Sequence, residues 1–421
     1  MKQRLRQLLI WSQKYTKTDM LYIAKGGFWL TLGQGVRMVS GLVLVVAFAN
    51  MLPKETYGTY QFVMSVATIL SACTLSGMGA SITRATAQGN EGALRYGFRT
   101  QLIWSIGIVL AAGAVALYYW LHENTPLAIA FLIVGACAPF LESFRLYRFY
   151  LRGKQHFRES EILGIIRLFL PLVVILTTLV YTENLVVLIA AYFLSHTLAV
   201  GLVYLQVLRT YTPPYTKDAD MVNLSKHLSF LNIIGTLGKH LDKLLIFHLL
   251  GPATVAAYIL AHVPLTHMRK ALAILTEMAI PKLSQRQFTV LQKTLPKKVW
   301  LFLLVTIVVA ILYILAAPLL FGFFFPDYPE SVVLTQALAL VLLSYPRSIY
   351  AQAFKAHALK REMYLTRLSI PILTIIFFSI LIPVYGVWGA VYAILATHLI
   401  SNVLVRYLFA RARIIPTDTS V

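Results

Sequence analysis

The stretch FHLLGPATVAAYI, residues 247–259, repeats the stretch ANMLPKETYGTYQ, residues 49–61, at an offset of 198 residues. In both stretches a short turn with a proline is followed by a helix, and Tyr60 and Tyr258 take the same place in it. The correspondence continues at Arg84 and Lys282, at RLFLP (167–171) and RLSIP (367–371), and at SHTL (195–198) and THLI (397–400). The chain is therefore predicted to contain two parallel repeats, related by an axis along a membrane normal.

The composition places these repeats in a membrane. The chain has 421 residues, of which 58% are hydrophobic and only 13% are charged, whereas a soluble domain has about 25% charged residues. Its apolar runs are long enough to cross a bilayer core of about 30 Å, and backbone amides in lipid must be paired within a helix. We predict an all-α polytopic membrane protein with twelve transmembrane helices, at 26–50, 57–83, 100–120, 126–148, 164–181, 185–208, 229–250, 254–280, 299–320, 331–353, 367–384 and 387–408.

The distribution of positive charge predicts the orientation of the helices. The connections that would face the outside contain a single Lys or Arg, Lys54, whereas the other connections and both chain ends are rich in them. Such a bias is typical of cytoplasmic segments, so we predict that both termini are cytoplasmic. The net charge of +21 is explained by this topology, and no nucleic-acid partner is expected.

The same pattern divides the chain into segments. Residues 1–25 read as a basic amphipathic helix on the inner leaflet, because they lack the long apolar run and small-residue cleavage site of a signal peptide. The remaining segments are an N-terminal six-helix bundle (26–208), a cytoplasmic linker rich in proline and polar residues (209–226), a C-terminal six-helix bundle (227–413) and a cytoplasmic tail (414–421).

Charged residues inside the predicted spans are the main functional signal. In GKHLDKLLIFHLLGP, residues 238–252, Asp242 and Lys243 lie about 12–14 Å from the outer turn, near the midplane, at a rise of about 1.5 Å per residue. A charge at the bilayer centre costs about 2.5–3.5 kcal/mol on insertion scales. These side chains are therefore expected to face a wet cavity between the halves or to pair with one another. In the second case Asp242 would neutralise Lys239, and arginines near the inner face would extend to the interface.

Cations outnumber carboxylates in these spans, which favours an anionic ligand such as a diphosphate, held by charge-assisted hydrogen bonds. We predict that a cationic cleft binds the substrate through Arg37, Lys239, Lys243, Arg269, Arg145 and Arg347.

Three further residues are candidates for coupling and motion. Asp242 and Glu142 are the candidate ion-coupling carboxylates, and Pro264, between two histidines of a predicted span, is the candidate hinge. The histidines show no metal-binding spacing such as HExxH, and no phosphate-binding GxxxxGK[ST] occurs. The sequence therefore predicts no bound metal and no cofactor, and it does not indicate a pump driven by ATP.

The sequence resembles a known family. The stretch FANMLPKETYGTYQFVMSVATILSACTLSGMGASITR (48–84) resembles the first helical hairpin of polysaccharide flippases in the multidrug/oligosaccharidyl-lipid/polysaccharide (MOP) superfamily. LDKLLIFHLLGPATVAAYILA (241–261) and IPKLS (280–284) resemble motifs of its second half, with Ala256 in place of the glycine of the turn. The matching positions of the first hairpin are Pro53, Tyr57, Gly58, Tyr60, Gly77 and Gly79.

This resemblance implies a twelve-span, MATE-like flippase of the Wzx type and no enzymatic activity. Such a protein turns undecaprenyl-diphosphate-linked oligosaccharides from the inner to the outer leaflet of the bacterial cytoplasmic (inner) membrane, for O-antigen and lipopolysaccharide, capsule or a related glycan. A polysaccharide polymerase and a chain-length regulator would be its partners. Two alternatives stay open, a MATE-like ion-coupled drug exporter and a membrane-embedded polysaccharide polymerase or ligase. Span 1 offers Arg37 and no carboxylate, which counts against the exporter.

Overall fold

The computed structural model describes residues 20–277 and 279–412. Within these ranges the regular elements are helices and no β-strand occurs, which confirms the predicted all-α class. The predicted tail, and residues 1–19 of the predicted amphipathic segment, lie outside the described residues. The helices are α2 (Met20–Met51), α3 (Lys54–Ala72), α4 (Met78–Ala87), α5 (Ala93–Trp104), α6 (Ile106–Leu121), α7 (Thr125–Phe144), α8 (Leu146–Gly153), α9 (Phe157–Tyr181), α10 (Leu185–Tyr211), α11 (Ala219–Leu250), α12 (Pro252–Glu277), α13 (Ile280–Ser284), α14 (Phe288–Phe324), α15 (Glu330–Ala339), the 3₁₀ helix η1 (Leu340–Arg347), α16 (Ser348–Ala356) and α17 (Lys360–Arg411).

Several predicted spans are not single α-helices. The span predicted at 57–83 is interrupted between α3 and α4, where the Gly77 amide donates a hydrogen bond of 2.9 Å to the Ser229 hydroxyl. The span predicted at 331–353 runs through α15, η1 and α16. The spans predicted at 367–384 and 387–408 form one helical run, α17, in which the backbone of Gly386 leaves helical geometry.

By length and composition, eight helical segments of the described ranges are long and apolar enough to cross a membrane. The spans predicted within α3–α4, α11 and α12 are not among them, because polar side chains lower the hydropathy of these helices. The chain is thus a polytopic membrane protein, and twelve spans with cytoplasmic termini stay a prediction. The eight segments are Phe28–Met51, Ala93–Leu121, Thr125–Gly153, Phe157–Tyr181, Leu185–Tyr211, Phe288–Phe324, Glu330–Ala356 and Lys360–Arg411.

The chain divides into two compact units. Unit 1 contains the described residues of Met1–Thr56 together with Val63–Thr236. Unit 2 contains Tyr57–Phe62 and the described residues of Leu237–Val421. The division falls inside α3 and α11, so the first turns of α3 belong to unit 2 and the first half of α11 belongs to unit 1.

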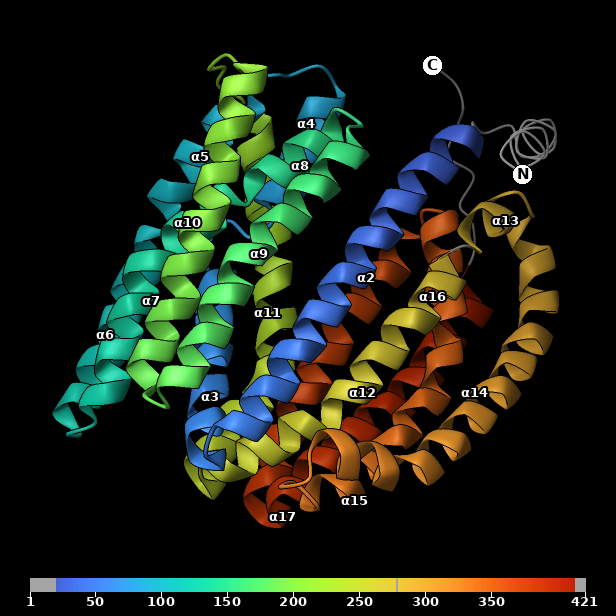
Figure 1. Cartoon of the computed structure of the whole chain (residues 1–421). Coiled ribbons are helices and arrows are strands. Elements are labelled where there is room, and N and C mark those ends of the chain that lie inside the picture. Colours follow the sequence, from blue (N-terminus) through green and yellow to red (C-terminus); the bar gives the residue numbers. More distant parts are fainter. Residues whose placement is uncertain (1–19, 278, 413–421) are drawn as a thin grey trace, which may run out of the picture. The chain divides into compact units, whose positions relative to one another are not determined.

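Unit 1 is built from long helices that pack along one another. Figure 1 shows α6 and α7 side by side with α10 next to α7, and α2 packs along α9. Small buried residues such as Ala112 and Ala130 allow α6 and α7 to approach closely. On α6, large apolar side chains such as Leu110 and Trp120 are exposed. Such a surface is suited to lipid.

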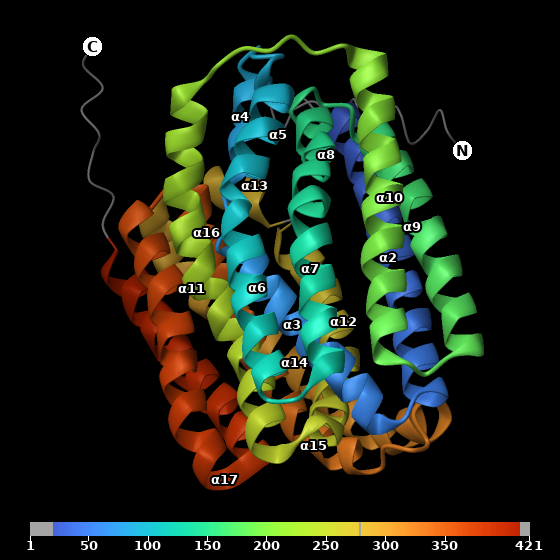
Figure 2. The same cartoon turned by 90° about the vertical axis from the view of Figure 1, so that its left-hand side faces the viewer.

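The segment between α10 and α11 is anchored to unit 1. Figure 2 shows it crossing the end of the unit at which α4 and α5 meet. There Asp218 accepts a hydrogen bond of 2.8 Å from the Asn90 amide and another of 2.8 Å from the backbone N–H of Met221. Asp218 therefore fixes the start of α11 against the α4–α5 turn.

In unit 2, α12 packs on α15, and α14 packs on α15 and η1. The buried Thr335 hydroxyl donates to the carbonyl of Ala261 at 2.7 Å and lies 2.6 Å from the Tyr313 hydroxyl. Because each buried polar group finds a partner here, α12, α14 and α15 are held in one register.

The first turns of α3 explain the glycine of the family motif. In unit 2, Tyr57 is fully buried and Phe62 stacks on Phe247 with ring centroids 3.9 Å apart. A Cβ atom on Gly58 would lie 1.8 Å from the carbonyl oxygen of Pro252. Only glycine permits this approach without a shift of the backbone.

Candidate functional site

Five arginines of unit 1 form one group, which we call the arginine cluster. Arg37 lies on α2, Arg145 at the end of α7, Arg148 and Arg152 on α8, and Arg167 on α9. Arg148 and Arg152 are one turn apart, and so point to the same side of α8. Arg167 interacts electrostatically with Arg37, Arg145 and Arg148.

Glu161 of α9 lies at the centre of the arginine cluster. Its side chain is 0% exposed. One carboxylate oxygen accepts from Arg37 Nη1 at 2.7 Å, and the other accepts from Arg148 Nη2 and Arg152 Nη2 at 2.8 Å each. A buried carboxylate is stable only with such partners. Glu161 therefore joins α2, α8 and α9 at one point.

The backbone leaves little space around this carboxylate. A Cβ atom on Gly33 of α2 would lie 2.1 Å from Glu161 Oε2 and 3.2 Å from Arg37 Nη1. Arg158 of α9 also stacks over the Trp29 ring of α2, at 5.5 Å from its centroid. The packing of α2 against α9 thus determines whether Arg37 reaches Glu161.

Arg145 and Glu142 form an ion pair of their own. The carboxylate of Glu142 accepts from Arg145 Nη1 at 2.6 Å, with a spacing of three residues on one helix. For Arg145 the sequence left open a wet cavity or an extension to the inner interface, and the pair with Glu142 was not predicted. Among the described residues, the five guanidinium groups of the arginine cluster thus pair with two carboxylates, which leaves an excess of positive charge.

In unit 2, Asp242 does not neutralise the lysines beside it. Its carboxylate accepts from the Tyr258 hydroxyl at 2.7 Å and from the backbone N–H of Lys243 at 2.8 Å. Among residues 20–277 and 279–412, no ion pair joins Asp242 to Lys239 or Lys243. The Lys243 ammonium instead lies 3.4 Å from Nδ1 of His240. Neither lysine side chain is thus held by the carboxylate of Asp242.

Two arginines of unit 2 differ in how they are held. Arg269 and Lys270 line a pocket of about 300 Å³ with Thr266 and Tyr345. Arg347, at the end of η1, donates to the backbone carbonyl of His398 at 2.9 Å, and its second Nη group lies 3.0 Å from His398 Nδ1. It also bonds the Ser401 hydroxyl.

These partners give the two arginines different roles. The acceptors of Arg347 are neutral and connect η1 to α17, so Arg347 supports the site, whereas Arg269 is directed into a pocket. Pro264 lies inside the continuous helix α12, and its role as a hinge stays a prediction.

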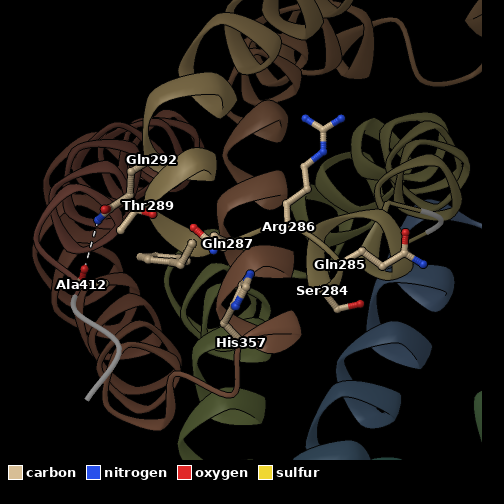
Figure 3. Close-up of a pocket in the computed structure, with 9 residues that line it drawn as sticks. Ser284, Gln285, Arg286, Gln287, Thr289, Gln292, His357 and Ala412 are labelled. Carbon is tan, nitrogen blue, oxygen red and sulfur yellow. Dashed lines mark hydrogen bonds between the residues drawn. The ribbon is translucent and has the colours of Figure 1, made fainter. Parts of the chain in front are cut away.

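A larger pocket of about 680 Å³ lies elsewhere in unit 2, where α13, α14, α16 and α17 end or begin. Figure 3 shows its side chains, with Gln292 donating to the carbonyl of Ala412 at 3.0 Å. His357 approaches the carbonyl of Leu283 at 3.1 Å. This pocket has no signal in the sequence, and none of the predicted site residues line it.

The structure adds four residues to the predicted site. Arg148, Arg152, Arg167 and Glu161 were not predicted, although RLYRFYLR at 145–152 places arginines on one helix face. That spacing was the available signal for Arg148 and Arg152. Of the predicted cations, Arg37 and Arg145 lie in unit 1, and Lys239, Lys243, Arg269 and Arg347 lie in unit 2.

The fold and these cationic groups define a helical membrane protein that carries charged side chains on its long apolar helices. A sequence profile described as "Polysaccharide biosynthesis protein" matches residues 23–287. The match covers more than half of the chain, and the chain therefore belongs to this polysaccharide biosynthesis family. The predicted resemblance to a polysaccharide biosynthesis family is thus confirmed. No curated protein matches the sequence.

Several solved structures share the fold. The lipid II flippase MurJ in an inward closed conformation matches with a TM-score of 0.71 at 13% identity, covering 90% of this chain and 86% of the other. An inward-facing multidrug resistance MATE family transporter of the MOP superfamily matches with a TM-score of 0.65 at 14% identity, covering 88% and 93%. A MOP superfamily transporter from Pyrococcus furiosus, described as having a binding pocket of reversed polarity, matches with a TM-score of 0.59 at 15% identity, covering 92% and 95%.

Proposed function

We propose that this protein is a flippase without enzymatic activity. It moves undecaprenyl-diphosphate-linked oligosaccharide repeat units from the inner to the outer leaflet of the bacterial cytoplasmic membrane by alternating access. The product serves the assembly of O-antigen, capsule or a related surface glycan. Membership of the polysaccharide biosynthesis family supports the link to glycans. The MurJ-like fold is compatible with a flippase.

The arginine cluster of unit 1 carries the proposal. Its guanidinium groups exceed the carboxylates around them, and Arg37, Arg148 and Arg152 keep 20–30% of their side chains exposed. A planar guanidinium fork matches the oxygens of a phosphate with two parallel hydrogen bonds. A diphosphate would therefore bind here, while its polyprenyl chain stays in the lipid.

Unit 2 supplies a second set of cations. Lys239 and Lys243 are not neutralised by Asp242, and Arg269 and Lys270 line a pocket without a carboxylate. These four groups would hold the diphosphate or acidic sugars. Asp242 is the candidate for ion coupling, because its partner is the neutral Tyr258 hydroxyl.

The topology completes the proposal. Twelve spans with cytoplasmic termini, a bundle at 26–208 and another at 227–413 would place most of the arginine cluster toward the cytoplasmic side, where the lipid-linked substrate is made. A polymerase and a chain-length regulator would act on the product at the outer face.

The test is to delete the gene and measure undecaprenyl-linked oligosaccharide on each face of the inner membrane. The proposal predicts accumulation on the cytoplasmic face and loss of finished polymer outside. Single repeat units on the outer face would instead indicate a polymerase. Unchanged lipid-linked sugar, with increased sensitivity to organic cations, would indicate drug export.

A further inference from the structure

The single negative charge of Glu161 is paired with three positively charged arginines. One guanidinium neutralises one carboxylate, yet Arg37, Arg148 and Arg152 all bond this carboxylate, at 2.7–2.8 Å. Like charges brought together repel one another unless an anion lies between them. The three arginines are therefore gathered at a cost that Glu161 alone does not offset.

The guanidinium groups of Arg148 and Arg152 are partly exposed, although the Nε atoms of both are buried without a partner among the described residues. Arg148 and Arg152 each direct Nη2 to Glu161, and within the described ranges no partner is found for their Nη1 groups. Glu161 itself is 0% exposed, whereas Arg148 and Arg152 are 20% and 30% exposed. An anion can thus reach the exposed part of these guanidinium groups, whereas Glu161 itself is closed to it.

A carboxylate and a phosphate offer the same acceptor geometry to a guanidinium fork. An arriving phosphate oxygen and Glu161 would therefore draw on the same donors. The Arg37 guanidinium also contacts Gln34 Oε1 at 3.3 Å, which gives it a neutral partner when it turns from Glu161.

From this geometry we infer that Glu161 is an internal anion that competes with the diphosphate for Arg37, Arg148 and Arg152. In the empty protein it keeps the three guanidinium groups gathered in place. When substrate is bound it weakens their hold, so that the diphosphate can leave on the other side. This positioning role rests on the proposed function, because it assumes that the arginine cluster binds the diphosphate.

The test uses Glu161→Gln in the full chain, with farnesyl diphosphate as a soluble probe. Affinity is measured by titration calorimetry, and flipping of lipid-linked oligosaccharide is measured in proteoliposomes. We expect about tenfold tighter binding of the probe together with slower flipping. A residue with only a structural role would lower both affinity and rate.

The matched control is Glu159→Gln. Glu159 lies on the same helix, and its carboxylate bonds the Tyr211 hydroxyl and lies 3.6 Å from His156 Nδ1, with no arginine contact among the described residues. The affinity of the Glu159→Gln protein for farnesyl diphosphate should equal that of the wild type. If Glu161→Gln does not yield folded protein, Glu161→Asp replaces it, because a shorter carboxylate reaches the three arginines less well while all of them are kept, and the same direction of change is expected.

Two results separate the inference from the proposed function. Wild-type protein that binds no farnesyl diphosphate and flips no lipid-linked oligosaccharide would overturn the proposed function. Wild-type protein that binds the probe, with equal or weaker binding by folded Glu161→Gln, would overturn the inference about Glu161 alone.

Discussion

Replacement of Gly33 by alanine tests the geometry of the arginine cluster. The added Cβ atom would lie 2.1 Å from Glu161 Oε2, where real side chains do not approach. Either α2 moves away from α9 or the carboxylate moves away from Arg37. Both movements break the bond of 2.7 Å between Arg37 and Glu161.

The magnitude follows from the bond that is lost. A hydrogen bond to a charged group contributes about 1.5–3 kcal/mol, so Gly33→Ala should lower the stability of the folded protein by about that amount. Gly35→Ala is the control on the same helix, because a Cβ atom there meets nothing within 4 Å. That variant should be neutral or more stable by about 0.5–1 kcal/mol, since alanine favours a helix over glycine.

The assay is thermal unfolding of the detergent-purified variants, read by tryptophan fluorescence or by the loss of the monodisperse peak after heating. Gly33→Ala should melt several degrees below wild type, and Gly35→Ala should not. Equal melting of the two variants would refute the close approach of α2 to Glu161, and with it the geometry of the arginine cluster.

Three other substitutions test unit 2. Tyr258→Phe removes the hydroxyl that donates to buried Asp242, and should lower stability by about 1–3 kcal/mol in thermal unfolding; an unchanged melting temperature would contradict this bond. Gly58→Ala places a methyl group 1.8 Å from the Pro252 carbonyl, and should reduce the amount of folded protein in the membrane, whereas wild-type abundance and melting would exclude the tight contact. Arg347→Lys replaces the guanidinium group that bonds His398 and Ser401 by a single ammonium group, and should lower the melting temperature although the charge is kept. A lysine variant as stable as wild type would show that the charge alone suffices there.

Much of the fold was predictable from the sequence, because hydropathy depends on local composition. Long apolar runs predicted a helical membrane protein, and the family motifs predicted the superfamily. The interruptions were not predictable in the same way. The break before Gly77 depends on the Ser229 hydroxyl, which is 152 residues away, and the 3₁₀ segment η1 gives no hydropathy signal.

The site was predictable only where its partners are neighbours in sequence. The pair of Arg145 and Glu142 follows from a spacing of three residues on one helix. The partner of Arg37 is Glu161, which lies 124 residues further along the chain, and no local pattern indicates it. For Asp242, pairing with Lys239 one turn away was one of two open alternatives. Its partner is instead the buried Tyr258 hydroxyl of the next helix, which no local pattern indicates.

The central claim is that arginine and lysine side chains on the membrane helices bind a lipid-linked diphosphate during transport. It is tested most directly by the rate at which lipid-linked oligosaccharide crosses proteoliposomes made with wild type, Arg37→Ala or Lys243→Ala. The account predicts a rate for wild type well above that of protein-free vesicles, and loss of this activity in both variants, each incorporated at wild-type amounts. Wild-type rates in both variants, or no activity of the wild type itself, would contradict it.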